Sequence, residues 1–113
     1  MKRDVAYLSH IRDAVRRIQD YTRDGQEAFM ASTLIQDAVI RNLEIIGEAT
    51  KALSPAFREQ HPNIPWSSMA GMRDVLIHGY MGVDLKIVWD VVDNRINPIV
   101  AEVERLLSDT THG

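Results

Sequence analysis

The chain has 113 residues, enough for one domain with a hydrophobic core and too few for two domains of ordinary size. Hydrophobic residues make up 45% and charged residues 26%, and no segment approaches the roughly 20 consecutive apolar residues of a membrane span, so a membrane protein is excluded. The formal net charge of −3 argues against a broad basic surface for nucleic acid, so any charge that binds RNA must be local.

The N-terminal half predicts two long helices. Apolar residues three or four apart predict a first helix from Val5 to about Tyr21, with Asp4 as its N-cap and a turn at residues 23–25 as its end. After a short, less regular stretch, Ser32 or Thr33 caps a long helix to about residue 53, and its wide apolar stripe makes it central.

Two features of the middle of the chain predict close packing and a short connection. Gly47 lies inside the central helix, where glycine costs about 1 kcal/mol relative to alanine, so we expect a neighbouring helix against the backbone there. Ser54 followed by Pro55 combines an N-cap residue with proline at the first helical position and predicts a short helix to about Gln60.

The C-terminal half predicts two more main helices. The first extends from Trp66 to about His78 and ends at Gly79. After a loop over 80–83, Asp84 caps a last helix whose apolar spacing continues to Leu106, with a kink expected at Pro98. Residues 108–113 are expected to form a loose tail. The predicted fold is therefore all-α, a bundle of four main helices and a short connecting helix, in one domain over 1–113.

The sharpest chemical feature is the segment RDVLIHGY at residues 73–80. Asp74 and His78 are four residues apart and share a helical face, so the carboxylate could orient the imidazole. Arg73 and His78 are five apart, which places them about 140° apart around a regular helix. They therefore reach one substrate only if Arg73 extends around the helix or the helix unwinds near Gly79.

RNA cleavage without a metal requires a base for the ribose 2′-hydroxyl, an acid for the leaving oxygen and a cation for the charge on phosphorus. His78 and Arg73 suit these roles, but one chain supplies a single histidine in this segment. A two-fold dimer formed around the third and fourth helices would bring together two histidines and two arginines and would create a local positive patch.

The segment Arg73-x4-His78-x-Tyr80 resembles the signature of HepT-like proteins in the HEPN superfamily. Further stretches resemble the family in the same order and cover roughly the middle half of the chain: residues 37–49, 64–66, 71–74 and 82–84. The resemblance implies a HEPN-type bundle and a ribonuclease toxin of a type II toxin–antitoxin system. Its RNA substrate is expected to be tRNA or mRNA.

The same resemblance assigns roles to the residues of the motif. The active site would combine Arg73 and His78 of both protomers of a homodimer, with Arg73 stabilising the transition state, His78 as acid or base and Asp74 as the orienting residue. The partner would be a small nucleotidyltransferase antitoxin that adds AMP to Tyr80. Nucleotide at this tyrosine would bring bulk and negative charge to the place of an RNA phosphate and silence the enzyme.

Other polar and aromatic residues are weaker candidates. Glu48 is a minor candidate, because a glutamate on a bundle helix is usually solvated or paired. No cofactor or metal site is predicted, since the remaining histidines lack ligand spacing and are expected at the surface: His10, His61 and His112. Trp66 and Trp89 stand at core spacing and are expected to pack rather than stack on bases.

The compartment predicted is the cytoplasm. The chain has no cysteine, which excludes disulfides and thiolate chemistry and fits a reducing compartment. Its first residues, MKRDVAYLSHIRDAVRR, contain frequent charges and no apolar core of a secretion signal.

Two alternatives to the nuclease remain open on the sequence. One is a non-catalytic helical module that docks on a nucleotidyltransferase or binds a nucleotide, in which Arg73 and His78 only hold the pose. The other is an unrelated structural bundle, which a monomer with buried His78 would favour.

Overall fold

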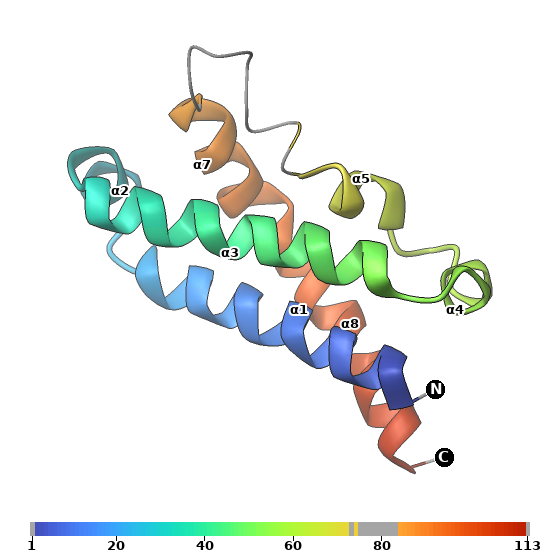
Figure 1. The fold of residues 1–113 in the computed structure, drawn as a ribbon. Helices are drawn as coiled ribbons and strands as arrows, with labels where there is room; N and C mark the ends of the chain where they lie inside the picture. The colour runs from blue at the N-terminus through green and yellow to red at the C-terminus, as the bar shows by residue number, and fades with distance from the viewer. Residues whose placement is uncertain (1, 73, 75–83, 113) are drawn as a thin grey trace.

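Helices make up most of the part of the chain that the structure describes. This structure, a computed structural model, describes residues 2–72, 74 and 84–112, and over them it contains no strand (Figure 1). The helices are α1 Lys2–Tyr21, α2 Gln26–Ala31, α3 Thr33–Ala52, α4 Pro55–Gln60, α5 Trp66–Ala70, α7 Leu85–Asn94 and α8 Ile96–His112. The predicted all-α architecture is confirmed.

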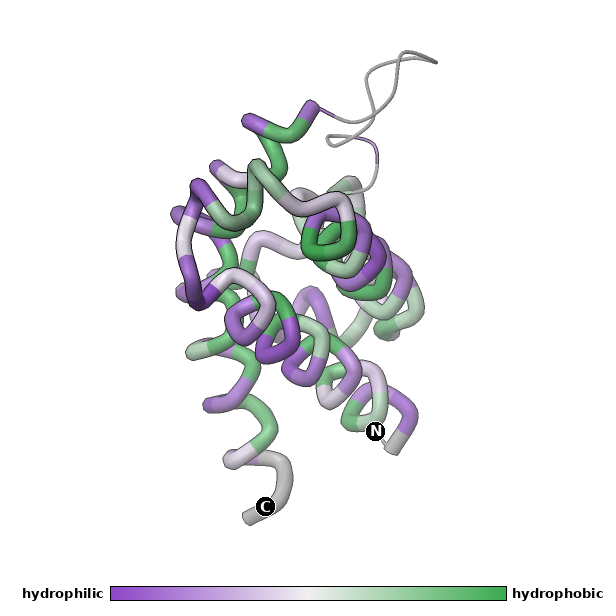
Figure 2. Tube along the Cα trace, turned by 90° about the vertical axis from the view of Figure 1, so that its left-hand side faces the viewer, coloured by the Kyte–Doolittle hydropathy of each residue, from purple (hydrophilic) through white to green (hydrophobic). Residues whose placement is uncertain are grey.

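The core lies between α1, α3 and α8. Helix α1 runs along α3 and also packs against α8, while α5 lies on α3 (Figure 1). Many of the apolar positions that predicted the first and central helices are fully buried, among them Leu8, Ile11, Val15 and Ile18 of α1 and Val39 and Ile46 of α3, whereas Leu34 of α3 is 79% exposed. Hydrophobic and hydrophilic residues alternate along the helices in Figure 2, as expected where one face of each helix is buried.

The N-cap predicted at Asp4 is wrong, because α1 begins at Lys2 and Asp4 lies in its first turn. The Asp4 side chain is instead buried against the start of α4. Its Oδ1 accepts a hydrogen bond from the Ser54 backbone N–H, and its Oδ2 accepts one from Ser54 Oγ, both at 2.9 Å. The carboxylate therefore joins two segments that are 50 residues apart in the sequence.

The predicted starts of α3 and α4 are confirmed. Ser32 Oγ accepts a hydrogen bond from the Ile35 N–H at 3.2 Å and caps α3. Ser54 Oγ likewise accepts from the Phe57 N–H at 3.2 Å, with Pro55 at the first position of α4. Before α2, Gly25 adopts φ 91° and ψ −175°, a conformation essentially restricted to glycine, and this allows the turn after α1.

The third main helix, predicted as continuous from Trp66, is interrupted at Gly71. Helix α5 ends at Ala70 with Gly71 as its C-cap, at φ −88° and ψ 7°. Glycine is a poor helix former, and the Gly71 N–H bonds back to the Ser67 carbonyl at 3.0 Å. Met72 and Asp74 are again helical. The remainder of the predicted helix and the loop after it lie outside the described residues.

The fourth main helix is divided into α7 and α8 at Arg95. Pro98 explains the break three residues before it, because proline lacks the N–H that would bond to the Asn94 carbonyl and its ring collides with that carbonyl. The kink expected from Pro98 is thus confirmed.

The C-terminal residues continue α8 instead of forming the loose tail predicted from residue 108. The helix extends to His112. Arg105 stabilises its end through ion pairs one turn before and after it, with Glu102 at 2.9 Å and Asp109 at 3.3 Å. Along the described residues, no helix is both long and apolar enough to cross a lipid bilayer.

Candidate active site

The segment with the predicted catalytic residues follows α5, and α5 is held directly against α3. A Cβ atom at Gly47 would lie 3.4 Å from the carbonyl oxygens of Met69 and Ala70. Met69 is itself fully buried. The close approach predicted at Gly47 is confirmed, and it fixes the backbone of α5 three to four residues before Arg73.

Trp66 anchors the other end of α5. Its indole Nε1–H is shared between the Arg58 carbonyl at 3.1 Å and the His61 carbonyl at 2.9 Å, and its ring centroid lies 6.1 Å from that of Phe57. Trp66 is 7% exposed, so the predicted core role is confirmed. Trp89 of α7 packs in the same way against Phe29, with centroids 5.5 Å apart.

Of the four motif residues, Asp74 is described, and it is exposed and helical. Arg73, His78 and Tyr80 lie outside the described residues, so the pairing of Asp74 with His78 stays a prediction. On the far side of the segment Asp84 caps α7 as predicted, since its Oδ1 accepts from the Lys86 N–H at 2.9 Å. In the sequence, the motif therefore lies between two helices, α5 and α7, that are each held by defined contacts.

Glu48, the minor candidate, takes part in an exposed ion pair on α3. Its Oε1 lies 3.7 Å from Arg41 Nη1, which is also 3.6 Å from Glu44 Oε2. The Glu48 side chain is 62% exposed. Such a pair contributes little to stability.

Two histidines outside the motif pack against aromatic rings. His10 of α1 is exposed and packs edge-on against Tyr7, with ring centroids 5.8 Å apart. His61 packs against Phe57, with centroids 4.7 Å apart. Within residues 2–72, 74 and 84–112, no three His, Cys, Asp or Glu side chains are grouped as metal ligands would be.

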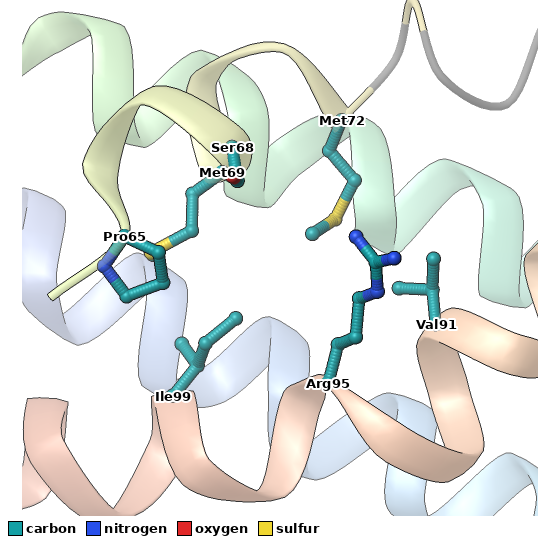
Figure 3. A pocket seen from close by; sticks show the side chains of 7 residues that line it. All are labelled: Pro65, Ser68, Met69, Met72, Val91, Arg95 and Ile99. Atoms are coloured by element: carbon teal, nitrogen blue, oxygen red, sulfur yellow. The ribbon is translucent and has the colours of Figure 1, made fainter.

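A pocket of about 200 Å³ lies between α5 and the junction of α7 and α8 (Figure 3). Its walls are mostly apolar, and Arg95 is the charged residue among those that line it: Pro65, Ser68, Met69, Met72, Val91, Arg95 and Ile99. Met72 is the residue before Arg73 in the chain. One wall of the pocket is therefore continuous with the motif.

Arg95 lies at the helix break caused by Pro98, and its guanidinium group points along the pocket wall toward Met72 (Figure 3). Its Nε is 3.8 Å from Asp90 Oδ2, and the Arg95 side chain is 60% exposed. Because this contact is long and uses the inner nitrogen, the two terminal nitrogens remain available at the pocket. Sequence reasoning missed this residue, although Pro98 did indicate a bend nearby.

The family model described as "Ribonuclease HepT-like" matches residues 11–106. A protein of Methanocaldococcus jannaschii named "Gamma-glutamylcyclotransferase and putative RNase" is 45% identical over 96% of this chain, which spans only 50% of that relative. A "Probable ribonuclease HepT" of Thermococcus cleftensis is 45% identical over 88% of the chain and 92% of the relative. A further "Putative RNase" of Methanocaldococcus jannaschii is 41% identical over 96% of the chain and 91% of the relative. No solved structure matches the chain.

The helical architecture, together with the motif that follows α5, defines an all-α bundle of the HEPN type. The chain belongs to the HepT-like ribonuclease family, because the family model covers residues 11–106 and includes the whole motif. The resemblance first seen in scattered segments thus extends over all the main helices.

Proposed function

We propose that the chain is a metal-independent endoribonuclease that acts as the toxin of a type II toxin–antitoxin system. The observation that carries this proposal is the family match over residues 11–106, which includes Arg73, His78 and Tyr80 in the expected spacing. The relatives named as RNases support RNA as the substrate. The whole chain would act as one domain.

The chemistry follows from the side chains of the motif. His78 would take the proton of the ribose 2′-hydroxyl, whose oxygen then attacks phosphorus, and the 5′-oxygen would leave with a proton from the second histidine. Arg73 would stabilise the extra negative charge on phosphorus. The products would be a 2′,3′-cyclic phosphate and a 5′-hydroxyl. Because two proton-transfer groups are needed, the site would be shared between the protomers of a homodimer.

Regulation would act on Tyr80. A nucleotidyltransferase antitoxin would transfer AMP from ATP to the Tyr80 phenol oxygen, which loses its proton while pyrophosphate leaves. The added phosphate, two residues from His78 in the sequence, would repel the RNA backbone. Asp74, which is exposed and helical, would hold the His78 imidazole in the tautomer that accepts the proton.

The test is RNA cleavage by purified protein in EDTA, with Tyr80 shown to be unmodified by intact mass. Arg73→Ala and His78→Ala should each abolish cleavage and leave the dimer intact. Matched controls are Arg105→Ala and His10→Ala, which remove the same groups from exposed positions and should cleave like the wild type. A folded, unmodified dimer that cleaves neither tRNA nor mRNA would instead indicate a docking module.

A further inference from the structure

The pocket beside the motif is too small for an ordinary small-molecule ligand and suits one flat group. Its volume of about 200 Å³ is below the roughly 300–1,000 Å³ of sites for drug-sized ligands. The pocket is not enclosed, because Ser68 and Arg95 of its lining are exposed. A flat group that enters it could remain attached to a chain outside.

The walls have the chemistry that an aromatic ring prefers. Met69 and Met72 contribute thioethers, which make favourable contacts with aromatic rings. Val91 and Ile99 close the opposite wall from α7 and α8. The Ser68 hydroxyl can both donate and accept, so it could bond to the edge of a heterocycle.

Arg95 adds a planar cation at the rim. A guanidinium group can stack on a base or hold a phosphate with two nitrogens, and lysine would do neither equally well. The long contact of Arg95 with Asp90, at 3.8 Å through Nε, leaves the fork of terminal nitrogens for such a ligand. An apolar slot with one planar cation at its mouth fits a base with its phosphate attached.

We infer that this pocket binds the base of an RNA nucleotide next to the cleaved bond, with Arg95 on that nucleotide's base or phosphate. The inference rests on the proposed ribonuclease function. It is supported by the chain itself, since Met72 of the wall directly precedes Arg73 of the motif in the sequence. A base in the pocket would therefore place the adjoining phosphodiester near Arg73.

The experiment uses the shortest RNA that the wild-type protein cleaves, with each base in turn replaced by an abasic residue. The stacking of one base contributes about 1–3 kcal/mol to binding. Removal of the base at one position next to the cleaved bond should therefore lower kcat/KM about tenfold. Ser68→Trp fills the pocket from an exposed position, so it should cleave the intact RNA about tenfold less well and be insensitive to the abasic residue.

Two matched controls accompany this scan. Ser67→Trp places the same ring on the neighbouring exposed position, which lines a separate groove on the other side of α5, and should behave like the wild type. Arg95→Gln should lower kcat/KM about tenfold, whereas Arg105→Gln on exposed α8 should not. If circular dichroism shows that Ser68→Trp does not fold, the inference is tested by Arg95→Gln and by the abasic scan of the wild type.

The outcomes separate this inference from the proposed function. If no abasic position lowers kcat/KM of the wild type, or if an abasic residue lowers kcat/KM of Ser68→Trp as much as that of the wild type, the pocket does not bind a base. The proposed nuclease is unaffected by either result. If the wild type cleaves no RNA, the proposed nuclease is overturned, and the assignment of a base next to a cleaved bond is overturned with it. If Ser68→Trp or Arg95→Gln converts a dimer to a monomer, the pocket is an interface between copies and the base assignment is wrong.

Discussion

Replacement of Asp4 by alanine should destabilise the fold more than replacement of any exposed charged residue of α1. The Asp4 residue is 4% exposed, and its two oxygens accept from the Ser54 N–H and Oγ–H at 2.9 Å. Hydrogen bonds to a charged group contribute roughly 1.5–3 kcal/mol each. Since Ser54 is partly exposed and water can replace some of this bonding, we expect Asp4→Ala to lower the free energy of unfolding by about 2–4 kcal/mol.

The assay is urea denaturation followed by circular dichroism and extrapolated to zero denaturant. Asp4→Asn keeps one oxygen acceptor and should cost about 1 kcal/mol. Asp13→Ala serves as the control, because it removes the same group from α1 at a position where the side chain is 42% exposed. A loss for Asp4→Ala no larger than for Asp13→Ala, or no coupling with Ser54→Ala in a double-mutant cycle, would refute the role of this tether.

Two further substitutions test the N-terminal half by the same assay. Gly25→Ala should cost about 1–3 kcal/mol through backbone strain alone, because φ is 91° while no atom lies within 4 Å of the added Cβ; an unchanged midpoint would mean that the turn relaxes freely. Phe29→Ala should cost about 3–5 kcal/mol, since Phe29 is fully buried against Trp89, and a loss below about 1 kcal/mol would show that α2 does not depend on this contact.

The helices could be predicted from the sequence because their signals are local. Apolar spacing located α1 and α3, and the caps at Ser32 and Ser54 were found from residues that bond within three positions of themselves. The misplaced cap at Asp4 shows the limit of such reasoning. An aspartate before an apolar run is a good N-cap, but its hydrogen bonds go to Ser54, a partner 50 residues away that no local pattern reveals.

The candidate site likewise has one part that the sequence could predict and one part that it could not. The residues of the motif carry recognisable chemistry in a fixed local spacing, so Arg73, His78 and Tyr80 could be named from the sequence and its resemblance to a family. The pocket has no such spacing, because α5, α7 and α8 build it from residues up to 34 positions apart, Pro65 to Ile99. Its apolar residues have the same periodicity as core residues, and Arg95 looks like any other surface cation. Arg95 stands at the break between α7 and α8 and lines the pocket, so its place there depends on how the helices pack.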